Sequence, residues 1–79
     1  MQISKIVETR DDNTIVFETE DGAQWAFDAT EYIRGPWFGK LADRDYFAQA
    51  QPYYGDAIGW PEGQSIGPED IDERSVRVG

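Results

Sequence analysis

The chain has 79 residues, which predicts a single domain over 1–79 whose core depends on three Trp, four Tyr and four Phe. It contains neither Cys nor His, which excludes disulfides, thiolate nucleophiles and imidazole acid–base catalysis. Sixteen Asp and Glu against seven Lys and Arg give a net charge of -9; such a surface repels phosphate and argues against direct binding of nucleic acid.

Alternating apolar and polar residues in the first third predict three antiparallel strands, over about 2–9, 14–19 and 23–28. One face of this meander is apolar and is expected to cover the core. The opposite face is mixed, acidic and at least partly exposed to water, and it carries Ile6, Glu8, Val16, Glu18, Gln24, Ala26 and Asp28.

The turns between these strands decide which residues face each other. A three-residue loop with Gly22 in the left-handed region aligns Phe17 with Trp25, whereas a two-residue turn there would set the apolar faces against each other. A loop of the same kind ending at Asn13 aligns Val7 with Phe17, because Asn tolerates the left-handed region. We therefore expect Val7, Phe17 and Trp25 side by side on the core face.

The middle of the chain predicts two short helical segments. Asp28 or Thr30 caps the first, which Gly35 and the following Pro then end. Asp43 caps the second, which continues through Phe47.

The last third predicts a hairpin over 49–53 and 57–60, with its Pro in an edge strand. Pro68 at a first helical position predicts a short helix over about 68–74, and 76–79 is expected to be a frayed tail. The fold class is therefore α+β, with a small antiparallel sheet and one or two short helices.

Several segments of the second half resemble domain-of-unknown-function family 2442, a family of small bacterial proteins. The segments are Leu41-Ala42-Asp43, Tyr46-Phe47, 54–63 and Ile66-Gly67-Pro68-Glu69, with Trp60-Pro61, Gly63 and Pro68 as the distinctive positions. The chain departs from the family pattern at Glu62 and at Gln64-Ser65, where the family has Asn and Ala-Asp. The resemblance implies an α+β fold and, since members are often described as partners of small toxin-like proteins, a neutralising role.

Two kinds of residue are candidates for contact with a partner. The first is a set of carboxylates that the three strands, the loop after the second strand and a helix start would gather into rows: Glu8, Glu18, Glu20, Asp21, Asp28, Glu69, Asp70, Asp72 and Glu73. These charges could instead only solvate the sheet or favour the helix dipole. The second is the aromatic pair Trp37 and Phe38, which forms either a structural turn or an exposed interface anchor.

Catalytic, metal and cofactor sites are not expected. The acidic run 69–73 lacks the alternate ligands and central Gly of a calcium loop, and Gly35–Lys40 lacks the spacing of a phosphate loop. Residues 1–8 contain no apolar run of a signal peptide and no stretch of the chain is long and apolar enough to span a membrane, so we expect a cytoplasmic protein.

These observations predict a non-catalytic acidic protein that binds the basic, nucleic-acid-engaging surface of another protein and so blocks it. A phage-encoded inhibitor of a nucleic-acid-guided defence complex and an antitoxin-like neutraliser both fit, with carboxylate rows that mimic a phosphate backbone. The alternative is a structural or regulatory module that forms a homodimer, or that serves a DNA-binding partner, through aromatic contacts.

Overall fold

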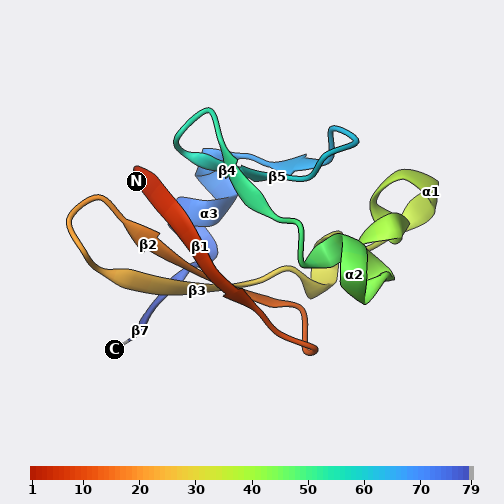
Figure 1. The fold of residues 1–79 in the computed structure, drawn as a ribbon, viewed down its shortest axis with the longest axis horizontal. Coiled ribbons are helices and arrows are strands. Elements are labelled where there is room, and N and C mark those ends of the chain that lie inside the picture. The colour runs from red at the N-terminus through yellow and green to blue at the C-terminus, as the bar shows by residue number, and fades with distance from the viewer. Residues whose placement is uncertain (79) are drawn as a thin grey trace.

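The computed structural model describes residues 1–78 and consists of two small antiparallel sheets and several short helices (Figure 1). The larger sheet has the strand order β1-β2-β3-β7, formed by Ile3–Thr9, Thr14–Thr19, Gln24–Asp28 and Val76–Val78. The smaller sheet has the order β4-β5-β6, formed by Gln51–Tyr53, Ala57–Gly59 and Ser65–Ile66. The α+β class is confirmed, and the β4–β5 hairpin lies where the sequence predicts it.

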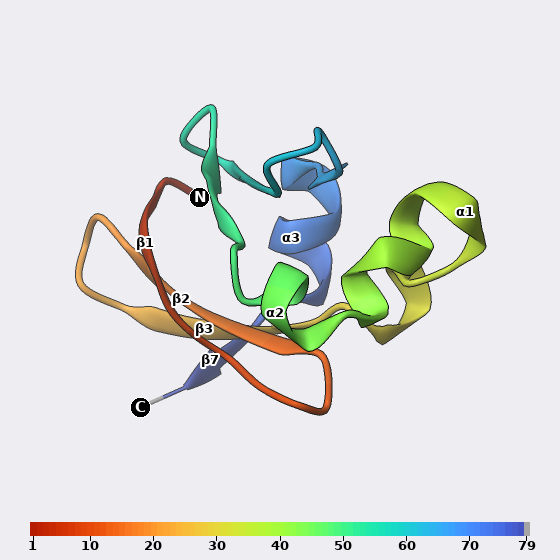
Figure 2. The ribbon, with the colours of Figure 1, turned by 45° about the vertical axis from the view of Figure 1, so that its right-hand side comes forward.

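Five short helical segments connect these strands. They are the 3₁₀ turn η1 (Thr30–Tyr32), α1 (Gly35–Phe38), the 3₁₀ turn η2 (Gly39–Ala42), α2 (Arg44–Phe47) and α3 (Pro68–Arg74). Two views show α3 and the β4–β5 hairpin on one side of the larger sheet (Figures 1 and 2). The other side of that sheet faces outward.

The β2–β3 pairing follows the predicted register. Phe17 lies opposite Trp25, and Gly22 closes the loop with a φ of 86°. Asn13 likewise takes a φ of 70° in the β1–β2 loop, because its short polar side chain is tolerated there. Both loops are therefore of the three-residue kind that the apolar pattern requires.

The predicted partner of Phe17 on β1 is wrong. Next to the β1–β2 loop the pairing follows the predicted register, with Glu8 opposite Val16. Further from the loop the register shifts by one residue, so that Ile6 rather than Val7 faces Phe17. A β-bulge adds one residue to β1 at this point and turns Val7 outward, where its side chain is 43% exposed. Ile6 packs against the core instead and leaves the outer face to which the alternation had assigned it.

The core lies between the larger sheet and the segments that cover it. Phe17 and Phe27 of the sheet pack with Leu41, Phe47 and Trp60, all of them buried. The Phe47 and Trp60 rings stack at 6.0 Å between centroids, and the Trp60 indole N–H donates to the Phe47 carbonyl oxygen at 3.1 Å. The buried aromatic residues that compensate for a short chain are thus gathered in one cluster.

Three local predictions for the connecting segments had different outcomes. Asp43 caps α2 as expected, since its carboxylate accepts from the backbone N–H of Asp45 and Tyr46. Gly35 begins α1 instead of ending the preceding helix. The Pro that follows it lies in the first turn of α1, a position that Pro tolerates because its missing N–H is not needed there. The first helical segment is only the η1 turn, and Asp28 accepts from the Thr30 N–H just before it.

The C-terminal helix is confirmed over Pro68–Arg74, but the segment after it is not a frayed tail. Residues 76–78 form β7, which pairs antiparallel with β3 so that Val76 faces Ala26 and Arg77 faces Trp25. Docking onto an existing strand supplies the hydrogen bonds that so short a segment cannot form alone. Gly79 lies outside the described residues.

Candidate functional site

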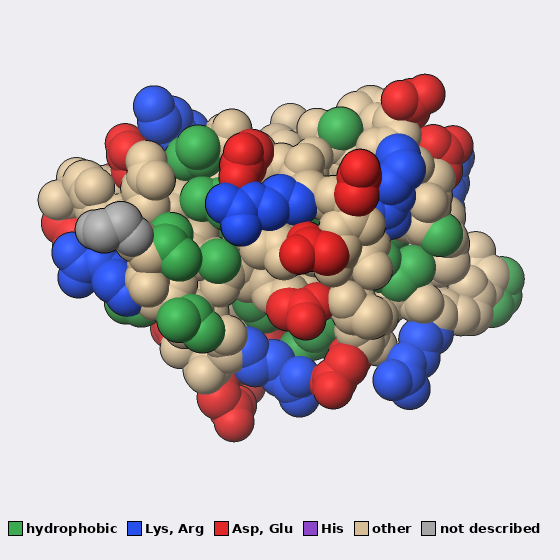
Figure 3. All heavy atoms as spheres, turned by 90° about the horizontal axis from the view of Figure 1, so that it is seen from below, with side chains coloured by type: hydrophobic (Ala, Val, Ile, Leu, Met, Phe, Trp, Pro, Cys, Tyr) green, Lys and Arg blue, Asp and Glu red, His purple; other side chains and the backbone are tan. Residues whose placement is uncertain are grey.

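The outer face of the larger sheet carries charges of both signs rather than a row of carboxylates. Glu8 pairs with Arg10, and Glu18 lies opposite Lys5. The view of the lower side of the molecule shows basic, acidic and hydrophobic side chains interspersed (Figure 3). Asp28 is also engaged internally, because it accepts hydrogen bonds from the Thr30 N–H and hydroxyl.

Two acidic segments that are far apart in sequence meet at one end of the molecule. The backbone N–H of Glu20, in the β2–β3 loop, donates to the Gln2 carbonyl oxygen at 3.1 Å. The Met1 ammonium nitrogen lies 2.9 Å from Asp72 on α3. The start of the chain therefore bridges the loop and the helix. We call this region the acidic end, formed by Glu20, Asp21, Glu69, Asp72 and Glu73.

Three of these carboxylates have no counter-charge of their own. Within residues 1–78, neither Glu20 nor Glu69 nor Glu73 makes an ion pair, and all three are exposed. Glu69 and Glu73 are four residues apart on α3, so they lie on the same side of the helix. The acidic end therefore projects uncompensated negative charge.

Asp70 belongs to a different cluster on the other side of α3. Burial and, next in size, the nearby Asp70 carboxylate raise the pKa of the Tyr32 hydroxyl. Arg74, which pairs with Glu31, lies over the Tyr32 ring at 5.7 Å. Asp70, one of the carboxylates that were predicted to bind a partner, thus helps to attach α3 to the segment around η1.

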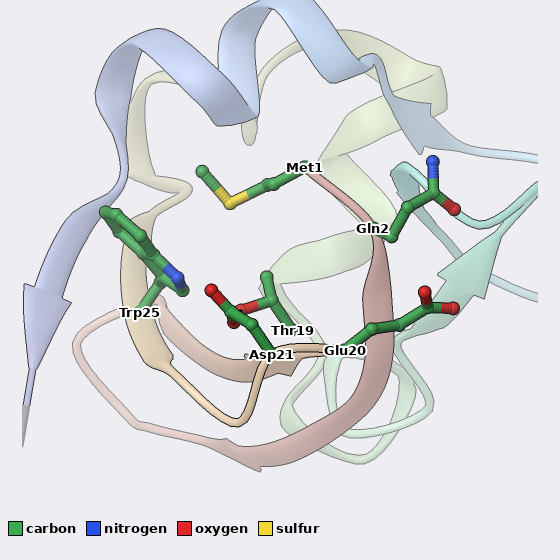
Figure 4. A pocket seen from close by; sticks show the side chains of 6 residues that line it. All are labelled: Met1, Gln2, Thr19, Glu20, Asp21 and Trp25. Atoms are coloured by element: carbon green, nitrogen blue, oxygen red, sulfur yellow. The ribbon is translucent and has the colours of Figure 1, made fainter.

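A pocket of about 290 Å³ opens within the acidic end, between the start of the chain and the β2–β3 loop (Figure 4). We call it the Trp25 pocket; its lining residues are Met1, Gln2, Thr19, Glu20, Asp21 and Trp25. Figure 4 shows the Trp25 indole and the Asp21 carboxylate on the same side of the pocket, with the indole nitrogen toward the carboxylate. An aromatic ring, a thioether and the Asp21 carboxylate therefore border one concave space, with Glu20 at its margin.

The Asp21 carboxylate is fixed and ionised at this position. The Thr19 hydroxyl donates to its Oδ1 at 2.6 Å and the Ala23 backbone N–H donates at 3.1 Å. These hydrogen bonds hold the pKa of Asp21 below its ordinary value of 3.8, with the larger effect from Thr19. The carboxylate is consequently negative at neutral pH.

The Trp25 ring has an unsatisfied polar edge. Its buried Nε1–H has no acceptor among residues 1–78, and the guanidinium of Arg77 lies over the ring, with Cζ 5.7 Å from the ring centroid. Sequence reasoning placed Trp25 on the core face only and did not identify the pocket. Its walls come from three separate segments, so no local motif marks it.

The aromatic candidate lies at the opposite end of the long axis, where α1 is found (Figure 1). Trp37 is 52% exposed and Phe38 is half-buried against the core. The Trp37 carbonyl oxygen accepts from the buried Gln64 side chain, which in turn accepts from the Tyr46 hydroxyl at 2.7 Å. The segment is therefore a firmly held turn that still presents one aromatic ring to solvent.

A further exposed aromatic residue, Tyr54, was not among the predicted site residues. It occupies the tip of the β4–β5 hairpin, is 87% exposed and has a φ of 52°. The next residue, Gly55, accepts a hydrogen bond from the Ile3 N–H, which brings this tip beside the start of the chain and the acidic end. A bulky residue in left-handed backbone is uncommon and costs free energy, so this position stands out.

Within residues 1–78, no group of three carboxylates is arranged to hold a metal ion. No helix in the same part of the chain has the length and apolar character needed to cross a membrane.

No family model, no curated protein and no solved structure matches the chain. The resemblance at Trp60-Pro61, Gly63 and Pro68 therefore stays a prediction. One of the positions at which the chain departs from that family pattern has a structural role here, because Gln64 is buried and connects Tyr46 to the backbone of α1.

Proposed function

We propose that the protein is a non-catalytic binding domain whose acidic end docks onto a basic surface of another protein. The partner is a protein that uses this basic surface to hold nucleic acid, and docking blocks that use. The observation that carries the proposal is the uncompensated charge of Glu20, which lines a pocket with an aromatic wall, together with that of Glu69 and Glu73 on α3, the helix to which Met1 connects this pocket through Asp72.

Charge alone would give steering and weak contacts, because exposed ion pairs contribute only about 0–1 kcal/mol each. Specific interfaces also need buried aromatic anchors. The acidic end has two candidates for this role, Tyr54 at the hairpin tip and the partly buried Trp25 in the pocket. A patch with carboxylates around aromatic rings is suited to lysine and arginine side chains.

The outer face of the larger sheet is a weaker candidate for phosphate mimicry. Glu8 is already paired with Arg10, Asp28 accepts from Thr30, and Lys5 lies next to Glu18 across the strands. We therefore assign the binding role to the loop and helix carboxylates, and not to the sheet.

A displacement assay tests this function. An octa-arginine peptide is bound to fluorescent duplex DNA, and the protein is added at about 0.15 M ionic strength. We expect the protein to release the DNA by capturing the peptide, without binding the DNA itself. The double variants Glu20→Lys/Glu69→Lys and Glu69→Lys/Glu73→Lys should each weaken capture roughly tenfold, which corresponds to about 1.4 kcal/mol.

The matched control reverses the same number of charges elsewhere. Asp11 and Asp45 are exposed and lie outside the acidic end, Asp11 in the β1–β2 loop and Asp45 on α2. The Asp11→Lys/Asp45→Lys variant therefore has the same net charge as the test variants but an unchanged acidic end. Equal loss in all three variants would contradict a localised site and indicate nonspecific attraction to net charge.

A second candidate function uses the opposite end of the molecule. There the half-exposed Trp37 ring lies beside Gly63. A Cβ atom added to Gly63 would be 3.6 Å from the Cζ2 atom of Trp37, which is ordinary van der Waals contact. This ring favours a structural or regulatory module that docks, or forms a homodimer, through aromatic contact. Such binding is insensitive to salt and is lost in Trp37→Ala, while the charge reversals at the acidic end leave it unchanged.

A further inference from the structure

We propose that the Trp25 pocket receives the guanidinium group of one arginine side chain from a basic partner. This inference rests on the proposed function and gives the chemistry of its central contact. A guanidinium is planar, carries five donors and stacks on aromatic faces, whereas an ammonium is a compact, strongly hydrated charge.

The walls of the pocket match these requirements one by one. Glu20 and Asp21 supply carboxylates at its rim, and Asp21 is fixed there by Thr19. Glu20 has no ion pair among residues 1–78, and Figure 4 shows its side chain on the Gln2 side of the pocket, so Asp21 is the carboxylate nearest the indole and Glu20 adds negative charge at the margin. Met1 and Trp25 supply the apolar surface against which an arginine stem can pack.

The Trp25 ring provides two further observations. It already accepts one guanidinium, that of Arg77, at 5.7 Å from its centroid, so its surroundings are compatible with cation–π contact. Its buried Nε1–H lacks an acceptor within the described chain, and a buried unpaired donor is costly. The indole nitrogen itself is buried, so a guest guanidinium would contact the Asp21 carboxylate and the partly exposed remainder of the ring, beside Arg77.

The volume agrees with one side chain and its adjoining backbone. About 290 Å³ is at the lower limit for small-molecule sites and offers no space for a drug-sized ligand or a folded element. Three of the lining residues, Gln2, Glu20 and Asp21, are exposed, so a partner surface can approach the pocket between the chain start and the β2–β3 loop.

The test uses short peptides and the three indole N–H signals in a ¹H–¹⁵N spectrum, with the Trp25 signal assigned through Trp25→Phe. The probes are acetyl-glycyl-arginyl-glycinamide and its lysine and citrulline counterparts; citrulline keeps the shape of arginine without the charge. We expect the arginine peptide to shift the Trp25 signal with a dissociation constant on the order of millimolar, while the Trp60 signal stays unchanged.

Glu20→Gln should weaken this binding roughly fivefold, and the matched neutralisation Asp45→Asn at the other end should not. Because Glu20 is exposed and makes no side-chain hydrogen bond within residues 1–78, the variant keeps the fold intact. Equal shifts with the lysine or citrulline peptide would overturn the assignment to arginine.

The two proposals fail in distinguishable ways. An unchanged Trp25 signal, together with octa-arginine capture that still depends on Glu20, Glu69 and Glu73, overturns the pocket and leaves the proposed function standing. A Trp25 shift with arginine peptides, together with octa-arginine capture that the control reversal weakens equally, supports the pocket and overturns the proposed function.

Discussion

The Thr19 hydroxyl donates a 2.6 Å hydrogen bond to Asp21 Oδ1, and this contact holds a carboxylate at the wall of the Trp25 pocket. The same carboxylate oxygen accepts from the Ala23 N–H, so it also closes the β2–β3 loop. One residue thus connects the folding of the hairpin to the charge of the acidic end.

Asp21 gives a prediction about acid stability. Its pKa is lowered in the folded protein, chiefly by the Thr19 hydrogen bond, so the folded state binds a proton less readily than the unfolded chain. The stability that it contributes is fully present above pH 3.8 and is lost as the pH falls through its lower folded value. Urea midpoints measured from neutral pH to about pH 2 should therefore fall less in Asp21→Asn than in the wild type.

The carboxylate of Asp12 also has a lowered pKa, since it accepts hydrogen bonds from Thr14, and it provides the comparison. Asp12→Asn should flatten the acid decline in the same way but leave octa-arginine capture intact. If Asp21→Asn showed the full wild-type decline, the assigned hydrogen bonds would be wrong.

Tyr46 gives a prediction about the buried polar network. Its hydroxyl donates to Gln64 and accepts from the Glu62 N–H at 2.8 Å, in a region closed to water. Tyr46→Phe leaves both partners unpaired and should lower the free energy of unfolding by about 1–3 kcal/mol in chemical denaturation. Asp45→Asn, one residue earlier but exposed, should change it by less than about 0.5 kcal/mol.

Tyr54 separates backbone strain from binding. Its φ of 52° suits Gly, so Tyr54→Gly should be more stable than Tyr54→Ala by about 1 kcal/mol, because both lack the ring and only Gly tolerates this backbone. Thermal or urea unfolding measures this difference.

Both Tyr54 variants should bind octa-arginine less tightly than the wild type and to an equal extent, since both have lost the exposed ring. If the octa-arginine affinity of the Gly variant equalled that of the wild type, and only the less stable Ala variant bound weakly, Tyr54 would be only a turn residue.

The salt dependence of binding distinguishes the two ends of the molecule. The screening length falls from about 8 Å at physiological ionic strength to about 3 Å at 1 M. We expect isothermal titration to show octa-arginine affinity falling steeply over this range for the wild type. An affinity that does not change with salt would instead favour the aromatic contact at Trp37.

The fold was predictable where local pattern and turn chemistry agree. Phe17 and Trp25 were aligned because Gly22 and the apolar alternation specify the same loop. The bulge at Val7 was not predictable, because the choice between Ile6 and Val7 depends on space in the assembled core. The strand at 76–78 was missed for a similar reason, since it exists only through pairing with β3.

The candidate site was predictable in kind but not in place. Composition indicated that carboxylates would matter, and Glu20, Asp21, Glu69, Asp72 and Glu73 were among the predicted residues. The alternation of apolar and polar residues also put Glu8 and Asp28 in this set. In the structure, however, Glu8 forms an ion pair with Arg10 and Asp28 accepts a hydrogen bond from the Thr30 N–H. The Trp25 pocket depends on Met1 and Gln2 lying beside the β2–β3 loop, a contact between remote segments that no spacing in the sequence encodes.

The central claim is that the acidic end is where a basic partner docks, and a backbone amide map of octa-arginine binding tests it most directly. In ¹H–¹⁵N spectra of the wild-type protein, we predict shifts concentrated at residues 1–2, 18–23, 54–55 and 69–73. Residues 11–12 and 35–47, around the opposite end, should stay unchanged. Shifts that cluster on 35–47, or that spread evenly over every exposed carboxylate, would contradict the account.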